Sequence, residues 1–175
     1  MKNTFRPLAL VVVAAALSAC SSMMQEQGPK AVAKLEPTRG NSTAGTVTFA
    51  QQGDLVQVTV QVTGLKPGQE HGFHLHEKGD CSSGDGMSTG AHFNPTGKMH
   101  GPQDAEHHAG DLPALKGDAN GNATVSFTLH GVTVGSGPTD LIGRGLIVHA
   151  NPDDYKTQPT GNSGARIACG VVTKA

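Results

Sequence analysis

The sequence predicts an all-β domain, built as a sandwich or a barrel. Apolar and polar residues alternate with a period of two in several segments, which is the pattern of half-buried strands. After the first 19 residues, no segment has the 3.6-residue period of an amphipathic helix. The 175 residues include 24 glycines, one Tyr and no Trp. Turns are therefore frequent, and the core must be built mainly from Val, Leu, Ile and Phe.

Two segments show the alternation most clearly. In residues 55–62 four valines share one face, and in residues 123–129 the apolar face is Ala123, Val125, Phe127 and Leu129. Less regular runs predict the remaining strands: residues 30–35, 45–50, 72–76, 141–149 and 166–173. Turn-forming triplets such as Gln52-Gly53-Asp54 and Lys66-Pro67-Gly68 separate the strands.

Two long segments, 77–111 and 150–165, have no regular pattern and are too long to be simple connections. Long loops on a compact β scaffold are where binding and catalytic residues usually lie. We therefore expect the functional site in these two loops.

The N-terminus has the features of an export signal. Lys2 and Arg6 precede an apolar run from residue 8 to residue 17, which is too short to span a membrane. The following Ser18-Ala19-Cys20 resembles a bacterial lipobox, which implies cleavage before Cys20 and lipid attachment to its thiol. The alternative is an ordinary export signal that contains a cysteine. We expect a signal peptide at 1–19, a lipidated flexible tether at 20–29 and one domain at 30–175.

The same reading predicts a location in the periplasm or cell envelope. The lipid on Cys20 would be the membrane anchor, and Ser21 in place of Asp favours the outer membrane. The chain has 13 basic and 14 acidic residues; without Lys2 and Arg6 the balance is 11 against 14, a net charge of −3. Nothing in this balance indicates a nucleic-acid partner.

Lipidation of Cys20 would leave Cys81 and Cys169 as a natural pair in an oxidising compartment. A bridge between them would contribute on the order of 4–5 kcal/mol in the chain-entropy model. The alternative, two free thiols acting as metal ligands, is less favoured because neither cysteine has a CxxC neighbour.

Histidines and one aspartate form a pattern typical of a metal site. His74 and His76 lie two apart in the extended segment 72–76, so their side chains point to the same side, away from Phe73 and Leu75. A second set is spaced at eight, eight and three residues through a Gly- and Pro-rich loop that can curl around an ion: His92, His100, His108 and Asp111.

His and Asp without Cys suit zinc or copper. His100, His108 and Asp111 supply three ligands, and His74 and His76 form a second open set with the later His149. His92 could serve both sets, because an imidazole that has lost its proton offers a lone pair on each nitrogen.

Several segments closely resemble the copper/zinc superoxide dismutases, in the same order along nearly the whole mature domain. They are Gly72-Phe73-His74-Leu75-His76, His92-Phe93-Asn94-Pro95, His108-Ala109-Gly110-Asp111-Leu112, Val148-His149 and residues 161–170. The resemblance implies a Greek-key β-sandwich or barrel of about eight strands with a metal-binding loop and an electrostatic loop. Together with the lipobox it points to a bacterial exported, lipoprotein-like type. It leaves monomer and homodimer open.

The resemblance implies an oxidoreductase that disproportionates superoxide by alternate reduction and oxidation of copper, and so protects the cell envelope. His92 would bridge one copper to one structural zinc and act in catalysis. Asp153 would hydrogen-bond His74 and His100, Arg166 would attract the anionic substrate, and Cys81 and Cys169 would form a disulfide. The implied ligands are, for copper, His74, His76, His92 and His149, and, for zinc, His92, His100, His108 and Asp111.

Some residues depart from the pattern or have no role in it. Thr157-Gln158-Pro159 carries neither the acidic pair nor the lysine of several relatives, so long-range steering of superoxide is unassigned beyond Arg166. His71, His107 and His130 are expected not to bind metal. A copper or zinc carrier without catalysis is the second hypothesis. A zinc hydrolase of the His-x-His-x-Asp-His type is disfavoured, because Glu77, Lys78 and Gly79 follow His76.

Overall fold

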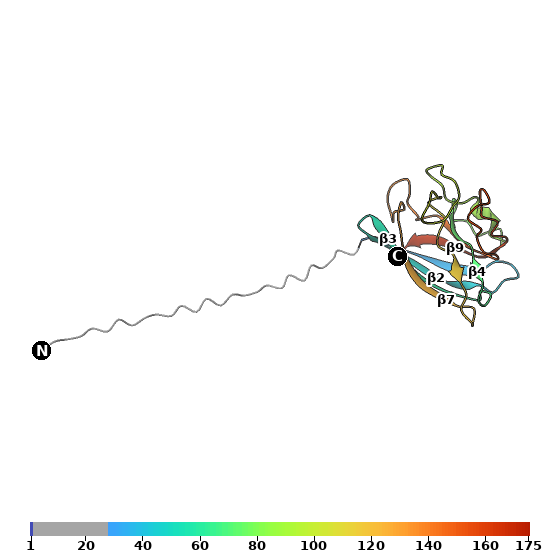
Figure 1. Cartoon of the computed structure of the whole chain (residues 1–175), viewed down its shortest axis with the longest axis horizontal. Coiled ribbons are helices and arrows are strands. Elements are labelled where there is room, and N and C mark those ends of the chain that lie inside the picture. Colours follow the sequence, from blue (N-terminus) through green and yellow to red (C-terminus); the bar gives the residue numbers. More distant parts are fainter. Residues whose placement is uncertain (2–27) are drawn as a thin grey trace.

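The computed structural model describes Met1 and residues 28–175 (Figure 1). The predicted signal peptide, the lipidation site Cys20 and most of the predicted tether lie outside the described residues. Nine strands and one short 3-10 helix, η1, are found in the described part: β1 (Lys30–Pro37), β2 (Ala44–Gln52), β3 (Leu55–Thr63), β4 (Glu70–His71), β5 (Phe73–His76), η1 (Met87–Thr89), β6 (Leu115–Lys116), β7 (Ala123–Leu129), β8 (Gly145–His149) and β9 (Arg166–Lys174).

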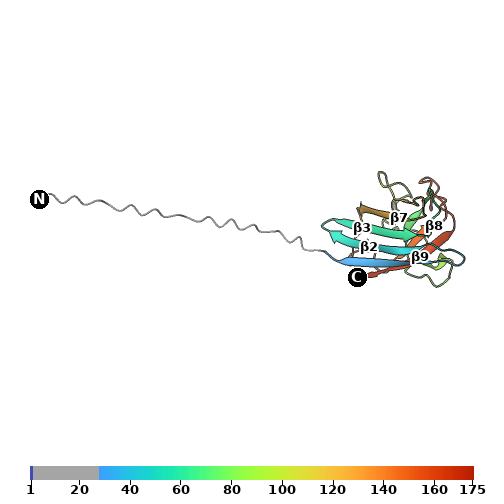
Figure 2. The ribbon, with the colours of Figure 1, turned by 90° about the horizontal axis from the view of Figure 1, so that it is seen from below.

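Seven strands form one curled antiparallel sheet in the order β5-β8-β9-β1-β2-β3-β7, and β4 pairs with β6. In Figure 2 strands β3 and β2 run side by side, and the blue strand β1 lies next to β2. The long connection between β7 and β8 and the return of β9 beside β1 make the order non-sequential. The predicted all-β fold is confirmed, and each long predicted strand is present within one or two residues of its expected ends, apart from one.

The exception is the strand predicted at residues 141–149, which begins only at Gly145. Residues 141–144 form a turn instead. The carboxylate of Asp140 accepts a hydrogen bond from the Ile142 backbone N–H at 2.9 Å, and Gly143 has a φ of 80°. Leu141 is fully buried from this turn, so its apolar side chain packs in the core without belonging to a strand.

The core lies inside the curled sheet and is made of Val, Leu, Phe, Ala and Ile side chains. The four valines of β3 that were predicted to share one face are all buried, while Gln57, Thr59 and Gln61 between them are partly or fully exposed. The tight turn into β3 needs a left-handed residue, and Gly53 supplies it with a φ of 58°. Alternation and turn chemistry therefore fix the register of β2 against β3.

Strand β7 departs from its predicted pattern. Ala123 and Leu129 are buried, but Val125 in the middle of the expected apolar face is 38% exposed. β7 is the last strand of the seven-stranded sheet and pairs within it only with β3. An edge strand lacks a neighbour on one side, so the core covers its ends but not its centre.

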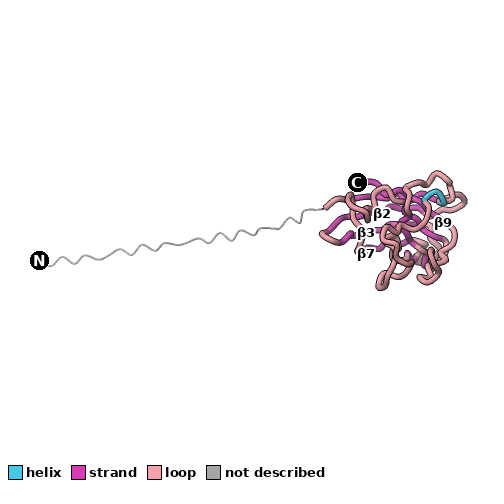
Figure 3. The backbone as a smooth tube through the Cα atoms, turned by 90° about the horizontal axis from the view of Figure 1, so that it is seen from above, coloured by secondary structure: helices cyan, strands magenta, loops and turns pink. Residues whose placement is uncertain are grey.

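Two long loops lie beside the scaffold, as predicted, and Figure 3 shows most of the loop chain, in pink, gathered beside the magenta strands. The first loop runs from β5 to β6 and contains η1. A disulfide between Cys81 and Cys169, with a Cα–Cα distance of 5.9 Å, ties this loop to β9. The second connects β8 to β9. Within the described residues no helix has the length and apolarity needed to cross a membrane.

Candidate metal centre

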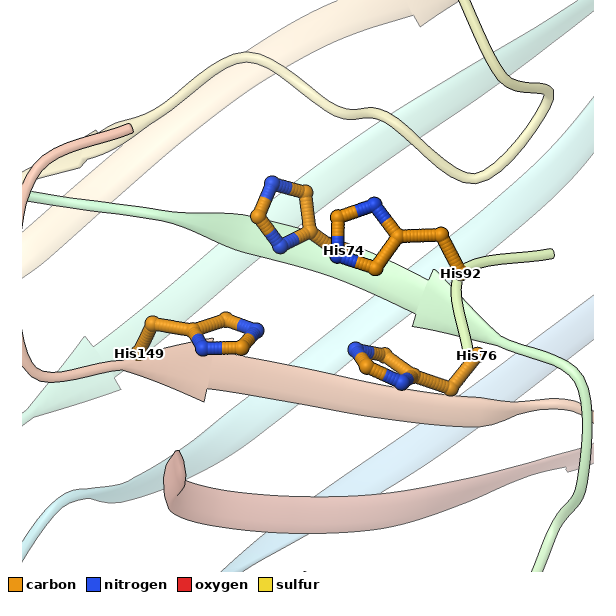
Figure 4. A group of neighbouring side chains, drawn as sticks. All are labelled: His74, His76, His92 and His149. Atoms are coloured by element: carbon orange, nitrogen blue, oxygen red, sulfur yellow. The ribbon is translucent and has the colours of Figure 1, made fainter. Parts of the chain in front are cut away.

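Four histidines from three parts of the chain meet on one side of the sheet. His74 and His76 come from β5, His149 from the end of β8, and His92 from the first long loop. Their ligand atoms all lie within 4.8 Å of one another, and all four side chains are buried. In Figure 4 the rings of His76 and His149 point toward each other, with those of His74 and His92 beside them. We call these residues group A.

A bulge sets the direction of His149. Val148 pairs with Ala168 but His149 pairs with Arg166, so one residue of β9 is skipped between them. Such an irregularity re-aims the side chain that follows it. The His149 side chain thereby points toward the other histidines of group A, and Arg166 lies directly across the strand pair from His149.

The second group consists of His92, His100, His108 and Asp111, whose ligand atoms also lie within 4.8 Å of one another. We call these residues group B. The first loop carries them by folding back along β5: Leu75 N–H donates to Gly110 O, and Phe93 N–H donates to Leu75 O, both at 2.8 Å. A Cβ on Gly110 would lie 2.3 Å from Leu75 O, so only glycine permits this close approach.

His92 belongs to both groups through different ring nitrogens. Its Nδ1 lies 2.9 Å from Asp111 Oδ1 in group B. Its Nε2 is buried without a hydrogen-bond partner, and the ring packs 4.1 Å from the His74 ring, centroid to centroid. One imidazole therefore lies between the two groups, which is the geometry that a bridging ligand requires.

The tautomers in group A leave one lone pair per ring facing inward. His76 and His149 each place Nδ1 within hydrogen-bond distance of a backbone carbonyl, Gly90 O at 2.9 Å and Gly164 O at 3.1 Å. A carbonyl only accepts, so each Nδ1 carries the proton and each Nε2 keeps a lone pair. Both Nε2 atoms are buried and have no partner among the described residues. A soft or borderline cation is the partner that such atoms fit.

Group B also has buried lone pairs that need a cation between them. His100 Nε2 lies 2.9 Å from Asp153 Oδ1, so this nitrogen carries a proton. Its Nδ1 then faces Asp111 Oδ1 at 3.0 Å. A lone pair and a carboxylate oxygen repel at this distance unless a proton or a metal cation lies between them. Three imidazoles and one carboxylate form the closed set of four that zinc prefers, so the donor set fits the metal.

Asp153 connects the two groups from the second loop. Its Oδ2 accepts from His74 Nε2 at 2.6 Å, and its Oδ1 accepts from His100 Nε2 at 2.9 Å. Gly161 makes room for this carboxylate, because a Cβ there would lie 1.9 Å from Asp153 Oδ1. Asp153 thus holds one ring of each group in a fixed tautomer.

Burial and charge set the protonation states. Burial lowers the pKa of His74 to about 4, of His76 to about 2 and of His149 to about 3. Burial also opposes the charged form of His100, but its hydrogen bonds to Asp111 and Asp153 outweigh burial and raise its pKa to about 9. The same hydrogen bonds, to His100 first, hold the pKa of both carboxyls below the usual range despite burial. At neutral pH His74, His76 and His149 are therefore neutral, while His100 is protonated and positively charged.

Arg166 lies close enough to group A for its charge to act on it. It is the second cause, after burial, that lowers the pKa of His76, and it also lowers that of His149. Burial lowers its own pKa. Its guanidinium is held by the segment from Gly86 to Gly90 of the first loop.

A cavity of about 220 Å³ reaches group B from the surface. It is lined by His92 and His108 and by Pro159 and Thr160 of the second loop, among others. Solvent can therefore approach the His92 ring between the two loops.

The histidines expected not to bind metal lie outside both groups. His71 is buried and its Nδ1 donates to His149 O at 2.8 Å, so it supports a group A residue from behind. His107 bonds to the carbonyl of His108, and His130 is exposed.

Sequence reasoning missed three residues near the site. They are Thr89, which contacts Arg166, Gln158, which holds the backbone of His100, and Tyr155, whose ring stacks on His100 at an interplanar angle of 7°. Single polar residues in loops give no periodic signal.

Comparison with known proteins agrees with this geometry. The family described as copper/zinc superoxide dismutase (SODC) matches residues 43–172. The chain is 46% identical over 151 residues to "Superoxide dismutase [Cu-Zn] 2" of Brassica juncea, covering 82% of this chain and 96% of that protein. The crystal structure of the clock protein EA4 superposes with a TM-score of 0.77 at 39% identity, covering 85% of this chain and 96% of that one. The chain therefore belongs to the copper/zinc superoxide dismutase family, enzymes that disproportionate superoxide with copper and zinc.

Proposed function

We propose that group A binds the copper and group B the zinc of this superoxide dismutase, with His92 as the shared ligand. The observation that carries this assignment is the pair of His92 nitrogens, one beside Asp111 and the other buried without a partner. Two further features support it. Group A consists of four imidazoles, which suit a redox metal, and group B includes the carboxylate that zinc accepts.

The reaction converts two superoxide anions and two protons to O₂ and H₂O₂, so one superoxide is oxidised and the other is reduced. Copper, when bound, supplies the one-electron exchange by changing oxidation state, whereas zinc has a filled d shell and does not. The chain's own residues must then bind an anion, deliver protons and hold groups A and B in fixed relative positions.

We assign proton delivery to His92 and anion attraction to Arg166. His92 Nε2 is buried without a partner among the described residues, and the same side chain lines a cavity of about 220 Å³. Arg166 contributes a permanent positive charge across the ladder from His149. A mature chain with a net charge near −3 does not attract superoxide by its total charge, so a local cation must do so.

Replacement of His92 by Ala tests the assignment. We expect the variant to lose most superoxide dismutation, to bind less zinc, and to lose the copper spectral features that depend on zinc. The exposed His130→Ala is the matched control and should keep all three. Retention of zinc and of the zinc-dependent spectrum by His92→Ala would contradict the bridge. Wild-type protein loaded with both metals that fails to speed superoxide decay would instead favour a metal carrier.

We also propose that the chain is exported, with residues 1–19 as its signal peptide, and is anchored by a lipid on Cys20, with residues 20–29 as the tether of the domain at 30–175. The basic, apolar and small-residue succession before Cys20 supports this. Expression of the full chain in a bacterium followed by mass spectrometry of the mature N-terminus tests it. Cys20→Ser should release the protein from the envelope membrane fraction.

We propose that the protein protects the envelope from external superoxide. Sedimentation of the purified protein distinguishes a monomer from a homodimer.

A further inference from the structure

The guanidinium of Arg166 is held by three hydrogen bonds, and a single side chain supplies one of them. Nη1 donates to Gly86 O at 2.8 Å and to Thr89 Oγ1 at 2.6 Å, and Nη2 donates to Gly90 O at 2.8 Å. Two of these acceptors are backbone carbonyls, which any residue would provide. Thr89 is the only side chain among the described residues that hydrogen-bonds this guanidinium, so it is the one partner that sequence can change.

Contacts other than Arg166 hold the Thr89 side chain in place, so it cannot move with the guanidinium. Its side chain is fully buried, and its hydroxyl donates to Gly86 O at 2.8 Å. Because a hydroxyl has one proton, the oxygen can only accept from Arg166. A Cβ on Gly145 of β8 would lie 2.6 Å from Thr89 Cγ2, so Gly145 makes room for this methyl group. The Thr89 carbonyl also accepts from Lys78 N–H at 3.0 Å.

The hydrogen bonds also link Arg166 to group A. The carbonyl of Gly90 that accepts from Arg166 Nη2 also accepts from His76 Nδ1 at 2.9 Å. Three of the five guanidinium N–H groups are used by the loop, and the Nε–H and one Nη2–H have no partner among the described residues. A fixed guanidinium therefore presents its remaining donors in a defined direction.

We propose that the Thr89 hydroxyl is a positioning residue for Arg166: it fixes the guanidinium so that its two unused N–H groups meet a small anion bound at group A. This inference rests on the proposed role of Arg166 in anion attraction. Without the hydroxyl, Nη1 would lose an acceptor at a partly buried position, and the guanidinium would turn to satisfy that donor elsewhere.

The test uses the copper- and zinc-loaded enzyme with azide, a small monoanion, as probe. Thr89→Val keeps the shape of the side chain and removes the hydroxyl, whereas Thr89→Ser keeps the hydroxyl. We expect Thr89→Val to weaken azide binding, read from the copper absorption band, by about tenfold, the usual value of one hydrogen bond to a charged group. The value of kcat/KM should fall in parallel, and Thr89→Ser should retain wild-type values of both. Thermal unfolding of each variant shows whether it is folded.

A double-mutant cycle with Arg166→Gln separates this inference from the function on which it rests. If Thr89 acts through Arg166, Thr89→Val should have no further effect on azide affinity in the Arg166→Gln background. An equal loss in both backgrounds, or wild-type affinity in Thr89→Val alone, overturns the inference. Wild-type affinity and activity in Arg166→Gln alone overturns the role of Arg166 itself. If Thr89→Val does not fold, the pair Thr89→Ser and Thr89→Ala, which differ only in the hydroxyl, carries the same comparison.

Discussion

The side-chain amide of Gln158 hydrogen-bonds to both backbone polar groups of His100, the N–H and the carbonyl. Gln158 Oε1 accepts from His100 N–H at 2.9 Å, and Gln158 Nε2 donates to His100 O at 2.8 Å. The two residues lie 58 positions apart, one in each long loop. Since His100 is a group B residue, this double hydrogen bond joins the loop that carries the proposed zinc ligands to the loop that carries Asp153.

Replacing Gln158 with Met, which has a similar length but no amide, should loosen His100. We expect zinc to leave the protein roughly tenfold faster, the lower end of what outer partners of metal ligands usually contribute. Zinc release to a coloured chelator measures this rate. Gln61→Met, at an exposed position of β3, should release zinc at the wild-type rate. Equal rates in all three proteins would show that the amide has no part in holding the metal.

Asp153→Asn should weaken metal binding at both groups. The amide keeps one acceptor but replaces the other with a donor, so either His74 or His100 must move its proton from Nε2 to Nδ1. For His100, Nδ1 is the atom that faces Asp111. We expect zinc affinity to fall roughly 10- to 100-fold, measured by competition with a chelator of known affinity. Asp104→Asn, an exposed change in the first loop, is the control, and wild-type affinity in Asp153→Asn would refute the role.

Zinc binding to the copper-free protein should release about one proton at pH 7. His100 is the source: burial opposes its charge, but Asp111 and Asp153 raise its pKa to about 9. Asp111, whose pKa is lowered, has no proton to lose at this pH. Calorimetric titration in buffers with different heats of ionisation counts the protons. The release should disappear above pH 9, and a binding heat independent of the buffer at pH 7 would contradict the charged state of His100.

The metal-free protein should lose stability as pH falls below about 6.5. Burial lowers the pKa of His74 to about 4, of His76 to about 2 and of His149 to about 3. Between the unfolded pKa of about 6.5 and these values, the unfolded chain binds protons that the folded chain does not. The free energy of unfolding should therefore fall with decreasing pH, by up to about 4 kcal/mol per pH unit if all three titrate independently.

The contribution of His100 to the free energy of unfolding has the opposite pH dependence. Its raised pKa contributes stability that is complete below about pH 6.5 and is lost as pH rises through about 9. Urea unfolding of the metal-free protein at several pH values between 4.5 and 7.5, in steps of about 0.5, tests the acid limb. His130→Gln, at an exposed position, should keep the wild-type slope. A flat profile over this range would show that the three rings remain accessible to protons in the folded state.

Much of this molecule could be predicted because its signals are local or periodic. The valines of residues 55–62 alternate, and His74 and His76 share one side of an extended segment. The spacing of His92, His100, His108 and Asp111 through a loop is also a local signal. Leu141 and Ile142 misled the prediction because apolar residues fill the core from a turn as well as from a strand.

Other features depend on contacts that no local pattern records. Thr89 meets Arg166 across 77 positions, and Gln158 meets His100 across 58. Each is a single polar residue whose partner is decided only when the two loops come together. Val125 was predicted to be buried with its strand's apolar face, and only the sheet order shows that its strand has no neighbour in the sheet on one side.

The proposed sharing of His92 by the two metals, together with the Asp153 carboxylate that touches a ring of each group, has a thermodynamic consequence. Two binding equilibria that use common ligands are linked, and linkage is reciprocal. Whatever factor zinc occupancy adds to the copper affinity, copper occupancy must add to the zinc affinity. The order in which a cell supplies the two ions therefore changes the intermediate that accumulates during maturation, but not the free energy of the finished enzyme.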